Sequence, residues 1–286
     1  MRFRYAASSF LALNHSIVET AAILRGAGCE GVEWRLHETG HIRPDTLEAD
    51  LAEAKKAQAA QDLTPVCLTS YLPMLDPELA RRDVDAAAEL GAKRVRLLWP
   101  PYDGTVPAGE VFSAARQAMD RLVPSLERAG VTMVFETHRG SIVPTASAAK
   151  RLVEPYPPAL FAVLYDPPNT VSSGFEDVGY ALDVLGPHLA HIQVKNVGWA
   201  FEDGQWKWGW MGLREGMVDW RVLLRHLERI GFDDWLSNEN FLLIGPDERP
   251  GRGEVSEALG AGYDDAWRDL AVSLRADVDY LEGLVS

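Results

Sequence analysis

Short apolar runs alternate with longer amphipathic segments along the whole chain. Runs rich in β-branched and aromatic residues predict eight strands, at residues 4–8, 31–35, 65–70, 94–99, 132–136, 162–166, 191–195 and 235–239. The segments between them space their apolar residues as one face of a helix does, most clearly at residues 45–59 and 112–129. This alternation is typical of βαβ units on a parallel sheet.

Glycine separates several predicted helices from the next strand. It stands at Gly28, Gly91, Gly130 and Gly231, and a glycine just past a helix readily adopts the left-handed conformation that ends it. Eight such units favour closure into a (β/α)8 TIM barrel that forms a single domain over residues 1–286, because these barrels commonly run to about 250 residues. The chemistry of such barrels lies at the carboxyl ends of the strands.

Carboxylates end three of the later predicted strands, at Glu136, Asp166 and Glu239. Three negative charges that meet at one mouth are costly to bury unless a cation balances them, which predicts one bound divalent metal ion. Strand alternation places His191, Gln193 and Lys195 on one side of the seventh strand, so one of them could complete the ligand shell. The alternative is a separate ion pair for each of the three carboxylates.

Several motifs, in this order, resemble the xylose-isomerase-like or sugar phosphate isomerase/epimerase superfamily: Phe-Glu-Thr-His at 135–138, Asp-Pro-Pro-Asn at 166–169, Gln-Val-Lys-Asn at 193–196, Glu-Gly-Met-Val-Asp-Trp at 215–220 and Gly-Phe-Asp-Asp-Trp-Leu at 231–236. The resemblance implies a metal bound by Glu136, Asp166, Gln193 and Glu239, with the two glutamates also acting as the acid/base pair. Most members have histidine at the position of Gln193. Because an amide oxygen is a hard ligand, glutamine favours magnesium or manganese over zinc or cobalt.

The function that the resemblance implies is a metal-dependent isomerase or epimerase of a sugar, keto-sugar or small hydroxy-keto compound, which would react through an enediolate. A related lyase or dehydratase acting on keto-sugars or glycosides would use the same chemistry. A non-catalytic sugar-binding barrel is a further alternative. An abasic-site endonuclease shares this barrel, but Asn169, Gln193 and a net charge of −14 oppose that function.

Contacts with a carbohydrate substrate are expected from residues near the strand ends and in the loop after the seventh strand, namely Glu33, His138, Asn169, Lys195, Arg214 and Trp208. That loop gathers five aromatic residues between positions 199 and 210. Sugars stack on aromatic rings, so the loop could form a wall or lid over the substrate. It could equally bury itself in a homo-oligomer interface.

Composition narrows the partners and the location. Of 286 residues, 47% are hydrophobic and 24% charged, an ordinary globular balance. The net charge of −14 repels phosphate backbones and anionic lipid, so neither nucleic acid nor membrane is expected as a partner. The two cysteines, Cys29 and Cys67, form no metal or redox motif. Because no apolar run approaches about 18 residues, the expected location is the cytoplasm.

Overall fold

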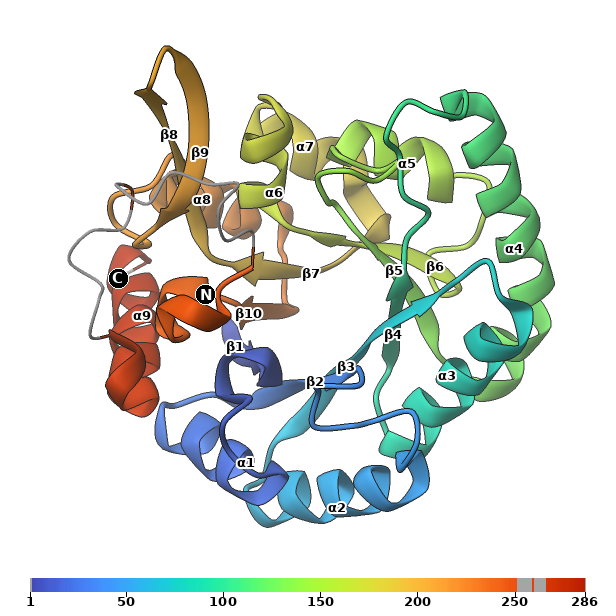
Figure 1. Cartoon of the computed structure of the whole chain (residues 1–286), viewed down its shortest axis with the longest axis horizontal. Coiled ribbons are helices and arrows are strands. Elements are labelled where there is room, and N and C mark those ends of the chain that lie inside the picture. Colours follow the sequence, from blue (N-terminus) through green and yellow to red (C-terminus); the bar gives the residue numbers. More distant parts are fainter. Residues whose placement is uncertain (1, 251–258, 260–265, 286) are drawn as a thin grey trace.

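Eight parallel strands close into a barrel in the computed structural model, which describes residues 2–250, 259 and 266–285. Around the barrel the strands follow the order β1, β10, β7, β6, β5, β4, β3, β2 (Figure 1). Their bounds are Arg4–Ser8 (β1), Gly31–Leu36 (β2), Thr64–Pro73 (β3), Arg94–Leu98 (β4), Thr132–Glu136 (β5), Phe161–Tyr165 (β6), Leu189–Val194 (β7) and Trp235–Asn238 (β10). The predicted (β/α)8 TIM barrel is confirmed.

Helices surround this barrel on its outside (Figure 1). They span Ile17–Gly26 (α1), Leu47–Ala60 (α2), Pro77–Leu90 (α3), Ala108–Ala129 (α4), Ala146–Val153 (α5), Pro167–Ser173 (α6), Val178–Leu185 (α7), Trp220–Ile230 (α8) and Leu270–Leu284 (α9). Within the described part of the chain, none of these helices combines the length and the hydropathy that a bilayer crossing requires.

The junctions between helices and strands have the glycine conformation that the sequence predicts. All four junction glycines have positive φ, between +63° and +89°, a conformation that side chains other than glycine rarely adopt. Strands β2 and β6 are buried at every position, as expected when helices cover the outside of a parallel sheet and side chains fill its inside.

The inside of the barrel is layered. A small apolar cluster, which includes Val66, Val134, Leu164 and Trp235, is separate from the large core between the barrel and the helices. Gly31 leaves room for this cluster, because a Cβ at that position would lie 2.6 Å from Val66 and 3.0 Å from the Trp235 ring. The inside of the barrel thus includes a tightly packed apolar layer as well as the polar residues described below.

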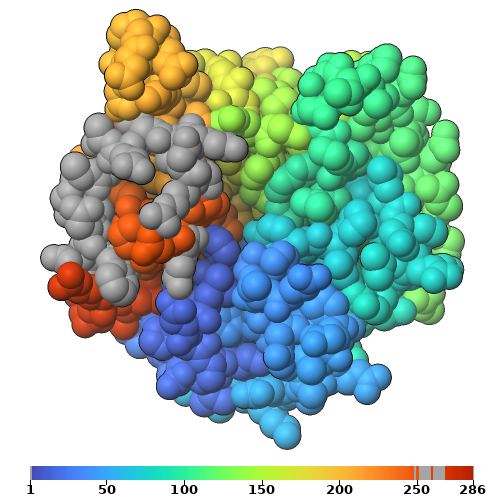
Figure 2. All heavy atoms as spheres, in the orientation of Figure 1, coloured from blue at the N-terminus to red at the C-terminus, as the bar shows by residue number. Residues whose placement is uncertain are grey.

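An antiparallel hairpin interrupts the barrel pattern after β7. Strands β8 (Asn196–Glu202) and β9 (Gln205–Met211) pair along their whole length. Asp203 and Gly204 join them with φ of +53° and +79°, as a two-residue type I′ turn requires. The hairpin projects beyond the outline of the barrel (Figure 2).

Candidate active site at the barrel mouth

A cavity of about 490 Å³ opens at the carboxyl ends of the strands. Its floor carries Glu136, Lys195 and Glu239, and the hairpin adds Trp208 and Trp210 to its wall. This volume suits a small ligand of sugar size, since ligand pockets commonly measure about 300 to 1,000 Å³.

The three predicted carboxylates do meet at this mouth. Glu136 is the last residue of β5, while Asp166 and Glu239 directly follow β6 and β10. All three are at most 4% exposed, and one ligand oxygen from each lies within 4.8 Å of the other two. Carboxylates this close must be balanced by positive charge or take up protons.

Protein cations supply part of that balance. The Lys195 ammonium, itself buried, lies 2.6 Å from Asp166 Oδ2 and 2.7 Å from Glu239 Oε2. Arg96, from the middle of β4, donates to Glu136 Oε2 from Nη2 at 2.6 Å and from Nε at 2.9 Å. The sequence left open a separate ion pair for each acid as the alternative to a shared cation. In the structure, one lysine bridges two of the acids and an arginine pairs with the third.

This arrangement shifts the pKa values of the three acids in different directions. Burial favours the neutral form of each acid and is the largest effect at Glu136, but Arg96, His138 and Lys195 together outweigh it and lower the pKa of that carboxyl. Burial and the negative charge of Glu136 raise the pKa of Asp166 to about 7, despite Lys195. The pKa of Glu239 is also raised, mainly by burial. Burial alone would lower the pKa of Lys195, yet the surrounding acids raise it.

Gln193 adds an oxygen without a hydrogen bond. Its side chain is 1% exposed, and its Oε1 has no hydrogen-bond partner within the part of the chain that the structure describes. An orphaned buried oxygen of this kind is costly unless a ligand completes it. Three carboxylates and one amide oxygen form a hard donor set that suits magnesium or manganese. The chemical types of these donor atoms therefore suit a divalent cation. Lys195 would have to leave the carboxylates that such an ion bound.

Asp166 also begins the short helix α6. Its Oδ1 accepts from the Asn169 backbone N–H at 2.9 Å, and two prolines occupy the first helical turn, a favourable start for a helix. This turn brings the Asn169 amide back over the acids, where Nδ2 donates to Asp166 Oδ2 at 2.7 Å and to Glu136 Oε1 at 3.1 Å.

The residues expected to contact substrate divide into two groups. His138, Asn169, Lys195 and Trp208 line the cavity. The His138 ring stacks on Trp99 with centroids 4.1 Å apart, and burial lowers its pKa to about 4. His138 is thus a neutral imidazole at physiological pH.

Arg214 and Glu33 lie elsewhere. The exposed Arg214 stacks on Tyr280 of α9, with 4.7 Å between its guanidinium and the ring centroid. Glu33 is fully buried and bonds His191 Nε2 at 3.1 Å. Neither residue lines the cavity, because the side chain of one is held against a helix and that of the other is closed inside the barrel.

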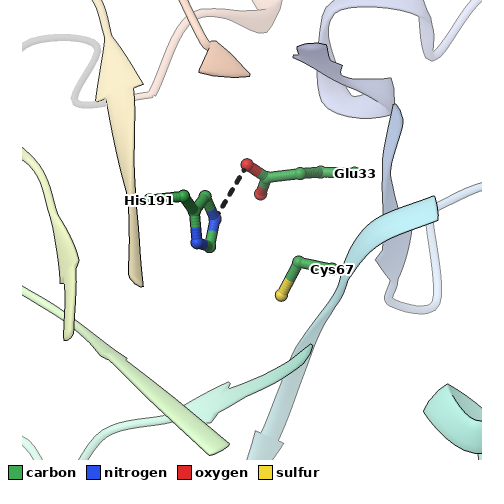
Figure 3. Close-up of side chains that lie close together, drawn as sticks. All are labelled: Glu33, Cys67 and His191. Atoms are coloured by element: carbon green, nitrogen blue, oxygen red, sulfur yellow. Dashed lines mark hydrogen bonds and ion pairs between the residues drawn. The ribbon is translucent and has the colours of Figure 1, made fainter. Parts of the chain in front are cut away.

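Glu33 belongs to a second buried cluster. Glu33, Cys67 and His191 point toward one another from β2, β3 and β7 (Figure 3), with ligand atoms within 4.8 Å. Thr69 Oγ1 also donates to Glu33 at 3.1 Å. Burial raises the pKa of the Cys67 thiol, and the Glu33 charge adds to this. The thiol therefore stays protonated, and the cluster serves as a polar layer below the mouth.

One arginine of the cavity, Arg96, was not among the expected site residues. It stands mid-strand between the buried Val95 and Leu97 in β4, and a charged residue inside a buried run was a signal for a site. Arg35, near the end of β2 between Trp34 and Leu36, also lines the cavity.

Comparisons with known proteins agree with this geometry. The model of the family described as xylose isomerase-like TIM barrel matches residues 21–275. No match was found among curated proteins. Similar solved structures include 3-keto-D-glucoside 4-epimerase from E. coli, at 14% identity and TM-score 0.70, over 99% of this chain and 100% of that one.

Two further structures resemble the chain over 99% of its length. D-allulose 3-epimerase from Methylomonas sp. has 13% identity and TM-score 0.73, with 98% of that chain covered. A putative xylose isomerase from Rhodospirillum rubrum ATCC 11170 has 16% identity and TM-score 0.74, with 99% covered. At these identities the likeness establishes the fold.

Proposed function

Because the chain belongs to the xylose isomerase-like TIM barrel family, we propose that it is an isomerase or epimerase of a sugar, keto-sugar or small hydroxy-keto compound. The observation that carries this proposal is the meeting of Glu136, Asp166 and Glu239 on the floor of a sugar-sized cavity. The sugar epimerases among the similar structures support it.

A divalent cation fits the proposed reaction. Glu136, Asp166, Gln193 and Glu239 would hold it, and Lys195 would withdraw to the edge of the site. When bound, such an ion polarises a substrate carbonyl and stabilises the enediolate formed on proton loss.

The chain's own carboxylates move the proton. Glu136 ends β5, Glu239 follows β10, and both carboxyl groups line the cavity, so a substrate bound there can meet both of them. One removes the proton from the carbon next to the carbonyl, and one returns it. Return to the neighbouring carbon, with the hydroxyl proton passing to the former carbonyl oxygen, gives an isomer, and return to the opposite face of the same carbon gives an epimer. A positioned acid or base of this kind contributes about 10² to 10⁴ in rate.

Neighbouring groups hold the pair in place. Two bonds from Arg96 and one from Asn169 fix the Glu136 carboxylate, and Lys195 holds Glu239 until an ion takes its place. The neutral His138 imidazole lines the cavity beside Glu136, and it is available to share a hydrogen bond with a substrate oxygen.

Hydrogen exchange at carbon tests the proposal. Incubation in heavy water with a panel of ketoses, keto-sugars and hydroxy-keto acids, in the presence of Mn²⁺ or Mg²⁺, is expected to introduce deuterium that mass spectrometry detects. Glu136→Gln should slow uptake by about 10³-fold, since it removes a proton-transfer group. Glu127→Gln, at an exposed position of α4, is the control that should not. Absence of deuterium uptake across the panel would contradict the proposal.

A further inference from the structure

One wall of the cavity is a stacked row of alternating rings and cations, made of Phe10, Arg35, Tyr71, Arg96, Trp99 and His138. From guanidinium carbon to ring centroid, Arg35 lies 4.5 Å from Phe10 and 4.8 Å from Tyr71. Arg96 lies 4.7 Å from Tyr71 and 4.0 Å from Trp99. The row follows neighbouring strands from β1 to β5, so adjacent barrel strands supply it in order.

The two arginines of this row differ in their partners. Arg96 is neutralised by Glu136. Arg35 is 7% exposed, and no carboxylate of the described residues lies within ion-pair distance of it. Its Nη1 reaches Thr39 Oγ1 at 3.2 Å and its side chain also bonds Tyr71, but its Nε has no hydrogen-bond partner among the described residues. A buried cation without a counter-ion is costly, although the two aromatic rings recover part of that cost.

The charged residues that line the cavity have a net positive charge, whereas the whole chain has a net negative one. Among its described lining residues are four cations, Arg35, Arg96, Arg139 and Lys195, but only two carboxylates, Glu136 and Glu239. Even with the buried Asp166 included, the four positive charges exceed the three negative ones by one, in a chain whose net charge is −14. A metal ion would add to this excess. Such a focused positive field draws an anionic ligand into the pocket.

We propose that the substrate of this site carries a carboxylate that Arg35 binds, so that the enzyme acts on a sugar acid or keto-acid in place of a neutral sugar. The inference rests on the proposed function and adds the class of its substrate. A carboxylate in the cavity can accept a charge-assisted hydrogen bond from the Arg35 guanidinium, which lines it. Phe10 and Tyr71 hold the guanidinium plane for it.

A carboxylate fits this site better than a phosphate. Phosphate sites commonly use the free N–H groups of a helix N-terminus. Helix α6, which lines the cavity with Asn169 and Ser172, is already capped at its N-terminus by Asp166, whose carboxylate form repels a phosphate. One buried guanidinium matches the single charge and two oxygens of a carboxylate.

Equilibrium binding distinguishes a ligand that carries a carboxylate from a neutral ligand and from a phosphate. D-Gluconate and D-sorbitol share a six-carbon polyol chain and differ at one end, where gluconate has a carboxylate. Calorimetry should show gluconate binding at least about 10-fold more tightly than sorbitol, as a charge-assisted bond predicts. Arg35→Met should remove this preference and Arg35→Lys should retain part of it, whereas Arg121→Met, at an exposed position of α4, should leave it unchanged. Repetition with EDTA excludes chelation of a metal by gluconate as the cause.

The outcomes are distinct from those of the proposed function. Equal binding of gluconate and sorbitol, or an unchanged preference in a folded Arg35→Met variant, would overturn the inference even if neutral ketoses exchange deuterium. Gluconate binding that depends on Arg35, in a protein that exchanges no deuterium, would support the inference and contradict the isomerase or epimerase. Tighter, Arg35-dependent binding of sorbitol 6-phosphate would overturn the assignment of a carboxylate. Circular dichroism establishes that each variant is folded.

Discussion

Lys195 is the single residue that most affects the charge of the site, because its ammonium lies where three carboxylates meet. In metal-free buffer, Lys195→Met leaves these buried acids without their shared cation. We expect the free energy of unfolding to fall by about 3 kcal/mol, as when one partner of a buried ion pair is removed. Added Mn²⁺ can replace the lost charge, so it should raise the melting temperature of Lys195→Met more than that of the wild type. Scanning fluorimetry with and without Mn²⁺ measures both effects.

The control for this prediction is another lysine. Lys207 pairs with Asp203 at 3.2 Å on the hairpin, where an exposed ion pair contributes at most about 1 kcal/mol. Lys207→Met should therefore respond to Mn²⁺ as the wild type does. An equal rise in both proteins would contradict competition between Lys195 and the cation, and no rise in either would show that no cation enters among Glu136, Asp166 and Glu239.

At the scale of the element, the β8–β9 hairpin combines two environments on one strand. Trp208 lines the cavity, and the Arg139 guanidinium lies 5.1 Å from its ring centroid. Trp206, two residues earlier, is 65% exposed at the tip. Trp208→Ala is expected to weaken gluconate binding about 10-fold, the scale of a lost aromatic contact, while Trp206→Ala should not change it. Calorimetry with both variants measures this, and equal effects would contradict a role of β9 as the cavity wall.

The elements differ in how far the sequence could predict them. Strands β1 and β5 have the predicted bounds and the other barrel strands differ by a few residues, because buried strands between glycine junctions have a clear local pattern. The hairpin was expected only as an aromatic loop, although Asp203-Gly204 between alternating aromatic residues is a hairpin signal. Lys195 was placed on the correct side of its strand. Its bridge between Asp166 and Glu239 depends on contacts across the barrel, which no local pattern encodes.

At the scale of the whole molecule, α9 returns to the barrel near the first strand and packs against both α1 and α8 (Figure 1). Asp277 of this helix accepts from Asn238 Nδ2 at 2.9 Å and from Asn240 Nδ2 at 3.0 Å. These two asparagines flank Glu239, so the last helix braces the backbone that carries a proposed catalytic residue.

Asp277 makes this brace dependent on pH. Burial, only partly offset by the asparagine bonds, raises its pKa from 3.8 to about 6. The folded protein thus holds the proton more tightly than the unfolded chain, and stability falls as the pH rises from about 4 to above 6. Asp277→Asn cannot ionise but still accepts both bonds. Urea unfolding should therefore show the variant gaining about 1 to 2 kcal/mol over wild type between pH 4.5 and 7.5, with allowance for partial exposure.

Exposed Asp279, whose pKa Arg275 lowers, gives the opposite control: Asp279→Asn should lose stability relative to wild type as the pH rises. Parallel pH profiles for Asp277→Asn and wild type would show that this carboxyl has no raised pKa.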